Sequence, residues 1–165
     1  MIEMNKRIVV IGSGNVATHL ALALYNKGYI IQQVYSRQMA NAETLAKRVG
    51  GVAVDNIADI VGDADFYFIS VKDDAIADIV SSLKIQNPDT VVAHTAGSVP
   101  LSVLSSKVAH SAVFYPMQTF SKQREVDFRV VPFFIESNSS EDTELLKAIA
   151  SVLSEKVYEA TSEQR

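Results

Sequence analysis

The sequence predicts an α/β protein in three layers, with a mostly parallel, doubly wound sheet and helices on both faces. Short apolar runs alternate along the chain with longer amphipathic segments. The first run, residues 7–11, is almost entirely apolar, which is typical of a strand that a parallel sheet buries on both faces. Strands that alternate with helices form βαβ units, and such units build parallel sheets covered by helices.

The individual elements follow from local signals. The first helix presents Val16, Leu20 and Leu24 on one face and ends at Gly28. Pro132 cannot donate to a strand ladder, so its strand is expected at a sheet edge or at a bulge. The expected strands are 7–11, 29–35, 52–54, 66–71, 90–94, 112–115, 129–135 and 156–159. The expected helices are 15–27, 40–49, 74–83, 101–105 and 140–153, with a helical turn at 56–61.

Composition narrows the function classes. The chain has 165 residues, the size of one domain, and is 48% hydrophobic and 21% charged, which is ordinary for a soluble globular protein. A formal net charge of -4 gives no electrostatic reason to expect nucleic acid or an anionic membrane as partner. The chain has no cysteine, which excludes disulfides, zinc-thiolate sites and thiol catalysis.

The sequence also bears on location. The apolar run near the N-terminus is too short for a signal peptide, and no run approaches the roughly 20 apolar residues of a membrane span. We therefore expect a cytoplasmic protein.

A glycine-rich turn is the first functional motif. Residues 11–17, IGSGNVA, follow a predicted strand, open a helix and fit the G-x-G-x-x-[GA] pattern. Gly12 permits the tight turn, Gly14 lets a pyrophosphate approach the backbone, and Ala17 lets helix and strand pack closely. The following amides point at the phosphates from the helix N-terminus, whose dipole favours anions. A glycine turn without a ligand is the alternative. The predicted dinucleotide contacts here are Gly12, Ser13, Gly14, Asn15 and Val16.

The end of the second strand indicates which dinucleotide binds. Many NAD-binding proteins carry an acid here, which accepts hydrogen bonds from both ribose hydroxyls and would repel the 2′-phosphate of NADP. This chain has Ser36, which can donate to that phosphate, and Arg37, which can pair with it and stack on adenine. The pair predicts NADP(H), against the alternative of an ordinary exposed Ser-Arg. A methyltransferase with a similar turn would more often place an acid at this position.

Polar residues also follow the next predicted strands, at 70–75, 94–100 and 115–120. In open α/β sheets the ligand lies across the carboxyl ends of the strands. His94 is a candidate proton donor because histidine titrates near neutrality, and a buried structural histidine is the alternative. Ser98 either contacts substrate or caps the following helix. Gln118 either lines the substrate side or braces its loop.

Other polar residues near these ends have simpler interpretations. Lys72 is either catalytic or solvent-facing, and Asp73 or Asp74 is expected to cap the helix that follows. His19 and His110 lie too far from the third histidine in the sequence to suggest a cluster, so no metal site is predicted.

Together, five stretches resemble a known family: GSGNVA, VYSR, ISVKDDAI, HTAGS and YPMQTFS. They are similar to a bacterial family of Rossmann-like dehydrogenases with a domain of unknown function after the cofactor domain. That family is related to pyrroline-5-carboxylate reductase and, more distantly, to the 6-phosphogluconate and 3-hydroxyacid dehydrogenases. For the nicotinamide side, the resemblance implies contacts from Val71, Lys72, Thr95, Ala96 and Gly97.

The resemblance also implies a further part. Family members continue with a helical C-terminal domain that builds a homodimer and one wall of the substrate pocket. We therefore expect residues 1–159 to form the cofactor domain and 160–165 to lead into such a domain.

The expected function is an NADP(H)-binding domain of an oxidoreductase that moves hydride between nicotinamide and a small C=N or C=O substrate. Two alternatives remain open: a non-catalytic module that senses nicotinamide nucleotides, and a deazaflavin-dependent reductase on the same fold.

Overall fold

The computed structural model describes residues 5–122 and 124–165. Its eight-stranded sheet has the order β3-β2-β1-β4-β5-β6-β7-β8. Only β6 and β7 run antiparallel among the paired strands. The strands are β1 (Arg7–Ile11), β2 (Ile30–Tyr35), β3 (Val52–Val54), β4 (Phe66–Ile69), β5 (Val91–His94), β6 (Ser111–Pro116), β7 (Phe133–Ser137) and β8 (Val157–Glu159). The predicted α/β class with a mostly parallel sheet is confirmed.

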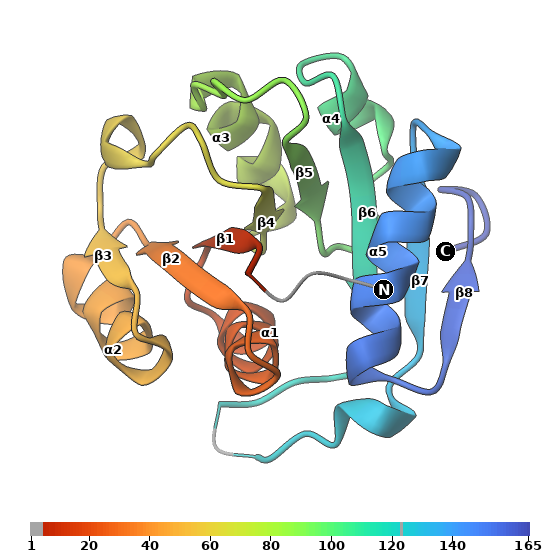
Figure 1. Ribbon diagram of the computed structural model, residues 1–165, viewed down its shortest axis with the longest axis horizontal. Coiled ribbons are helices and arrows are strands. Elements are labelled where there is room, and N and C mark those ends of the chain that lie inside the picture. Colours follow the sequence, from red (N-terminus) through yellow and green to blue (C-terminus); the bar gives the residue numbers. More distant parts are fainter. Residues whose placement is uncertain (1–4, 123) are drawn as a thin grey trace.

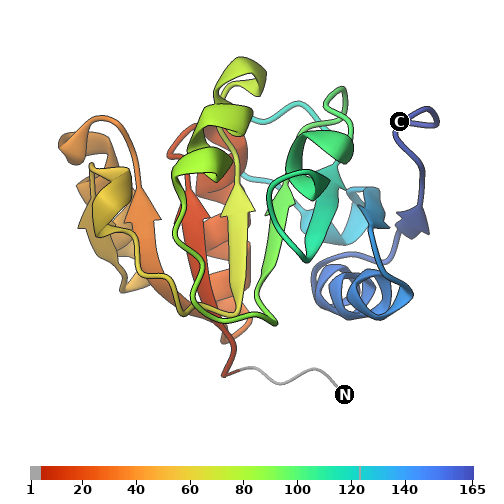
Figure 2. The same ribbon diagram turned by 90° about the horizontal axis from the view of Figure 1, so that it is seen from above.

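Helices cover both faces of the sheet (Figures 1 and 2). The helices are α1 (Asn15–Asn26), α2 (Met39–Val49), α3 (Ile76–Ser82), α4 (Ser102–Ser105) and α5 (Ser140–Leu153). Short 3-10 turns lie at Ile57–Asp59, Asp73–Ala75 and Phe128–Val130. One core cluster joins α1, α2 and α5 to one face of the sheet, and a second joins α3 and α4 to the other. These three layers place the carboxyl ends of β1, β2, β4 and β5 side by side.

Alternating strand residues supply the two cores. Phe68 and Phe114 point toward the α1 and α5 side, where their ring centroids lie 5.0 Å apart. Phe133 continues this row, 5.0 Å from the ring of Phe114. Tyr67 and Val92 point to the opposite face and pack under α3 and α4. Both faces of the central strands are therefore buried, which explains their continuous apolar sequence.

One predicted strand is corrected. The chain at Phe128–Val130 forms a 3-10 turn, because the Asp127 carboxylate accepts a hydrogen bond from the backbone N–H of Arg129 at 3.1 Å. The strand begins only after Pro132 and runs Phe133–Ser137. It does not lie at the sheet edge either, since β8 pairs along its outer side.

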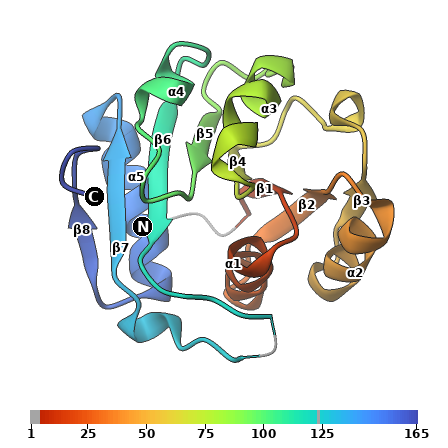
Figure 3. The ribbon, with the colours of Figure 1, turned by 180° about the vertical axis from the view of Figure 1, so that it is seen from behind.

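The long connection between β6 and β7 runs alongside α1 (Figures 1 and 3). His19 on α1 contacts the backbone carbonyl of Ser121 through Nε2. The ring of Phe120 lies 5.8 Å from that of His19 and also 5.8 Å from that of Phe128. The connection thus packs against α1 at His19, in the first half of the helix.

Candidate functional site: a cleft at the carboxyl ends of the parallel strands

The glycine turn is held tightly between three strands. Gly12 has φ +126°, a backbone conformation that side chains rarely allow. Its N–H donates to the carbonyl of Tyr35 at 2.8 Å, and a Cβ at this position would lie 2.0 Å from the carbonyl oxygen of Ser70. The Ser70 N–H in turn donates to Ile11 at 2.8 Å. The ends of β1, β2 and β4 therefore meet at a position that only glycine can occupy.

Gly14 stands in a different environment. It precedes α1 with extended backbone angles, and a Cβ added there would have no atom within 4 Å. No side chain caps α1, and its first turn contains no acidic residue. The first amides of the helix are therefore free to bind an anion, and the open space at Gly14 lets a phosphate approach them.

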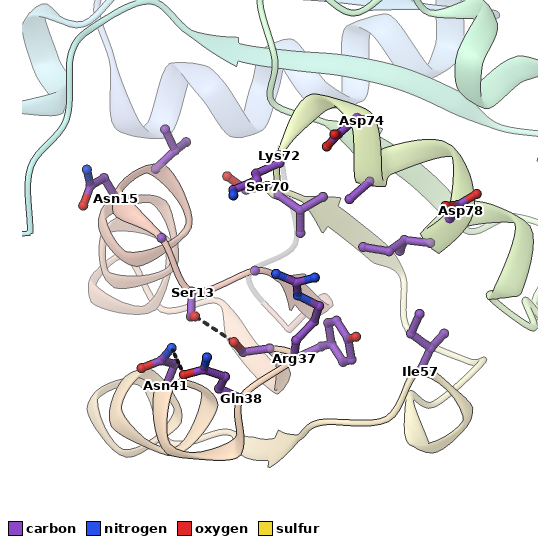
Figure 4. A pocket seen from close by; sticks show the side chains of 18 of the residues that line it. Ser13, Asn15, Arg37, Gln38, Asn41, Ile57, Ser70, Lys72, Asp74 and Asp78 are labelled. Carbon is purple, nitrogen blue, oxygen red and sulfur yellow. Dashed lines mark hydrogen bonds between the residues drawn. The ribbon is translucent and has the colours of Figure 1, made fainter.

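A second set of polar groups gathers where β2 leads into α2. The Ser13 hydroxyl donates to the Ser36 hydroxyl at 3.0 Å, which joins the glycine turn to the end of β2. Arg37 is exposed and makes no hydrogen bond or ion pair with any residue that the structure describes. Figure 4 shows its guanidinium reaching into the cleft between the glycine turn and α3. Helix α2 also begins without a capping side chain or an acid in its first turn.

These groups line one cleft of about 1170 Å³. The predicted cofactor residues that line it are Gly12, Ser13, Gly14, Asn15, Val16, Ser36, Arg37, Val71 and Lys72. The residues that the sequence prediction missed are Tyr35, Gln38, Asn41, Ile57, Ser70, Asp74, Ala75, Asp78, Ile79 and Ser82. Five of the missed residues, from Asp74 to Ser82, recur at helical spacing. This spacing could have indicated from the sequence that one face of α3 borders the site. Asp74 and Asp78 face Arg37 across the cleft (Figure 4).

Thr95, Ala96 and Gly97 do not line this cleft, because they follow β5, one strand further along the sheet. Thr95 is buried and Gly97 packs against the ring of Tyr115, where a Cβ would lie 2.6 Å from the ring carbon Cζ. The glycine turn lies at the end of β1. An extended dinucleotide with its adenosine over β2 and its pyrophosphate on α1 continues over β4 toward this loop.

His94 lies at the end of β5 but inside the core, with no exposed surface. Its Nδ1 accepts the N–H of Ala96 at 3.0 Å, which places the proton of the neutral ring on Nε2. Burial and the nearby Arg165 guanidinium together lower the pKa of His94 to about 4. His94 is therefore neutral at physiological pH and does not reach the cleft, so the geometry favours the structural alternative.

The other candidate residues at the strand ends are Ser98, Lys72 and Gln118. The Ser98 hydroxyl donates to the Asp73 carboxylate at 3.0 Å, which links the ends of β4 and β5. Neither side chain caps a helix, and neither does Asp74, so the predicted caps are wrong. Lys72 is exposed at the edge of the cleft. Gln118 is exposed on the connection after β6 and lies outside the cleft.

Within residues 5–122 and 124–165, no three histidine or carboxylate side chains come together as a metal site would require. None of the helices there is long and apolar enough to cross a membrane.

Comparisons with known proteins agree with this geometry. Residues 7–97 match the family model described as NADP oxidoreductase, coenzyme F420-dependent. A solved structure from Bacteroides fragilis, described as a candidate NADP oxidoreductase, is 49% identical over 98% of this chain, with a TM-score of 0.95. The fold and the cleft define a dinucleotide-binding oxidoreductase domain. The chain belongs to this family of NADP oxidoreductases.

More distant structures share the fold. A pyrroline-5-carboxylate reductase from Coxiella burnetii is 17% identical over 98% of this chain, with a TM-score of 0.76. A prephenate dehydrogenase from A. aeolicus, solved with NAD+, is 14% identical over 96%, with a TM-score of 0.79. The chain spans only 62%, 60% and 60% of the Bacteroides, Coxiella and A. aeolicus chains. A comparison with curated proteins gives no match.

Proposed function

We propose that this domain binds NADP(H) in preference to NAD(H). The observation that carries the proposal is the unpaired Arg37 guanidinium beside Ser36 at the uncapped start of α2, facing the cleft. A 2′-phosphate there would receive two charge-assisted hydrogen bonds from the guanidinium and one from the hydroxyl. The residues at the end of β2 include no carboxylate that would repel this phosphate. The nucleotide's pyrophosphate would lie on the open amides beyond Gly14.

Within a longer protein, we propose that the domain supplies the cofactor for hydride transfer to or from a small C=N or C=O substrate. The nicotinamide would carry the hydride, and residues of this chain at the ends of β4 and β5 would hold the nicotinamide ring. Support comes from the family and from the fold shared with pyrroline-5-carboxylate reductase. We further propose that the substrate is bound, and a homodimer built, with the help of a domain that follows residue 165. The protein would act in the cytoplasm.

The test of cofactor choice is a calorimetric titration with NADPH and with NADH. We expect NADPH to bind at least tenfold more tightly, a difference of about 1.4 kcal/mol, and Arg37→Ala to remove that preference. Arg48→Ala is the matched control, because Arg48 is an exposed arginine on the last turn of α2 and lies outside the cleft. Equal affinities in the unchanged protein, or a preference that survives Arg37→Ala, would contradict the proposal.

Two other functions are tested by following the oxidation or reduction of the nicotinamide. A sensing module is favoured by the burial of His94, which leaves the cleft without a histidine proton donor among the described residues. For the longer protein that includes the domain after residue 165, it predicts tight NADPH binding without oxidation of NADPH by any of a panel of small imines and ketones. The family's description favours a deazaflavin partner, which predicts reduction of NADP+ by reduced coenzyme F420. Absorbance of the reduced nicotinamide distinguishes all three.

A further inference from the structure

The last residues of the chain fold back onto the loop that follows β5 and onto Glu136 near the carboxyl end of β7. The side chain of Arg165 has no exposed surface, and its Nη1 lies 2.5 Å from Glu136 Oε1 on β7. Nε donates to the carbonyl of Gly97 at 3.3 Å, and Nη2 donates to that of Val99 at 2.5 Å. A buried guanidinium is costly unless its donors are paired, and here they hold a carboxylate and two carbonyls of a single loop.

A second residue of this segment strengthens the attachment. The Ser162 hydroxyl accepts the N–H of Leu101 at 3.1 Å and donates to Glu136 Oε1 at 2.9 Å. Glu136 therefore joins both contacts to β7. The C-terminal segment therefore binds three backbone groups of the loop between β5 and α4, residues 95–101: the carbonyls of Gly97 and Val99 and the N–H of Leu101.

The loop is also connected to the rim of the cofactor cleft, although residues 95–101 do not line the cleft themselves. Ser98 is bonded to Asp73, whose neighbours Lys72 and Asp74 both line the cleft. The sheet order β2-β1-β4-β5 places adenosine over β2 and pyrophosphate at the end of β1, so the second nucleotide extends over β4 to this loop. A shift of the backbone at Gly97 would change the surface on which the nicotinamide lies.

We propose that Arg165 is a positioning residue for the nicotinamide half of the cofactor, acting through the loop carbonyls of Gly97 and Val99. The proposal rests on the dinucleotide function proposed above. Without the guanidinium, two loop carbonyls lose this donor, Glu136 keeps only the Ser162 hydroxyl of the C-terminal segment, and the loop loses its fixed conformation. The adenosine half would lie over β2, with β1 and β4 between it and this loop, and would keep its contacts.

The experiment compares two probes: NADPH, and 2′,5′-ADP, which carries the 2′-phosphate but no nicotinamide. Arg165→Met combined with Glu136→Gln removes the ion pair without leaving a buried carboxylate unpaired. We expect this variant to bind NADPH at least tenfold more weakly, about 1.4 kcal/mol, and 2′,5′-ADP with the same affinity as the unchanged protein. Amide hydrogen exchange should also accelerate at residues 96–101.

The matched control is Arg129→Met, which removes an exposed arginine paired with Asp127 and should change neither affinity. If the double variant fails to fold, as judged by thermal melting, Arg165→Lys and Ser162→Ala are the milder tests. The lysine can keep one of the three partners, so it should recover part of the NADPH affinity.

The results separate the two proposals. Equal loss of both probes, or no loss of NADPH affinity with unchanged hydrogen exchange, overturns the role of Arg165. Failure of the unchanged protein to bind either probe overturns the dinucleotide proposal, and the role of Arg165 with it. Loss confined to NADPH, together with faster exchange at residues 96–101, supports both.

Discussion

The carbonyl oxygen of Ser70 lies where the side chain of residue 12 would begin, 2.0 Å from a Cβ placed on Gly12. This close approach joins the end of β4 to the glycine turn. The second glycine of the turn, Gly14, has no atom within 4 Å of such a Cβ. One glycine therefore serves the fold, and the other leaves space for a ligand.

We expect Gly12→Ala to destabilise the protein. The methyl group would meet a backbone carbonyl and would also sit on a residue with φ +126°, so the turn must distort. The free energy of unfolding should fall by roughly 2 to 4 kcal/mol, measured by urea denaturation. An unchanged midpoint would show that the ends of β1 and β4 can separate at little cost.

Gly14→Ala should leave stability nearly unchanged but weaken cofactor binding. Its φ of -76° and ψ of -162° suit alanine, so stability should change by less than about 1 kcal/mol. Binding of NADPH should weaken at least tenfold, or about 1.4 kcal/mol, because the methyl group occupies the approach to the α1 amides. Calorimetry measures the affinity. Undiminished binding would place the pyrophosphate elsewhere.

Ser36→Asp should shift the cofactor preference toward NADH. A carboxylate at the end of β2 accepts hydrogen bonds from the ribose hydroxyls and repels a 2′-phosphate. The ratio of NADPH to NADH affinity should fall by at least tenfold, again about 1.4 kcal/mol. Ser36→Ala is the control: it removes the hydrogen bond from Ser13 without adding charge and should lower the ratio much less. Equal effects of both substitutions would mean that Ser36 does not lie beside the phosphate.

The parts of the fold that depend on local pattern were predictable from the sequence. Strand β1 and helix α5 have the predicted bounds, and the other helices differ by one or two residues at their ends. The glycine turn and Ser36-Arg37 lie together in one cleft because their motif encodes its own geometry. Each of these signals spans only a few consecutive residues of the sequence.

Long-range pairing could not be predicted in the same way. The apolar run after Phe128 reads as one strand, yet Asp127 turns its start into a 3-10 helix and Pro132 delays the ladder. Likewise, the sequence offered no sign that Arg165 is buried against Glu136, because its partners lie on distant elements. By residue type His94 could be a proton donor or a buried structural histidine, and the three-dimensional packing favours the buried histidine.

The aromatic row under α1 and α5 should dominate stability. Phe114 is fully buried, and its ring centroid lies 5.0 Å from both Phe68 and Phe133. Phe114→Ala should lower the free energy of unfolding by about 3 to 5 kcal/mol, through lost burial and the cavity left behind. Phe134→Ala is the control, since this ring is only partly buried on the other face of the sheet and should cost clearly less. Urea denaturation compares the two, and equal losses would contradict the packing described.

His94 should make stability depend on pH. Burial, with the adjacent Arg165 charge, lowers the pKa of His94 to about 4 in the folded protein, whereas a free histidine titrates near pH 6.5. Between these values the unfolded chain binds a proton that the folded protein does not. The free energy of unfolding should therefore fall as pH drops through this window, by about 3 kcal/mol in all, and should not depend on His94 at higher pH.

His94→Asn tests this directly, because an asparagine oxygen can accept the Ala96 N–H that Nδ1 now accepts. The variant should lose the His94 contribution, so its free energy of unfolding should change less between pH 7 and pH 4 than that of the unchanged protein. In the unchanged protein, NMR should show His94 ring signals that stay constant from pH 7 to pH 5. Ring signals that titrate near pH 6.5 would show that the ring is solvated and would restore it as a candidate proton donor.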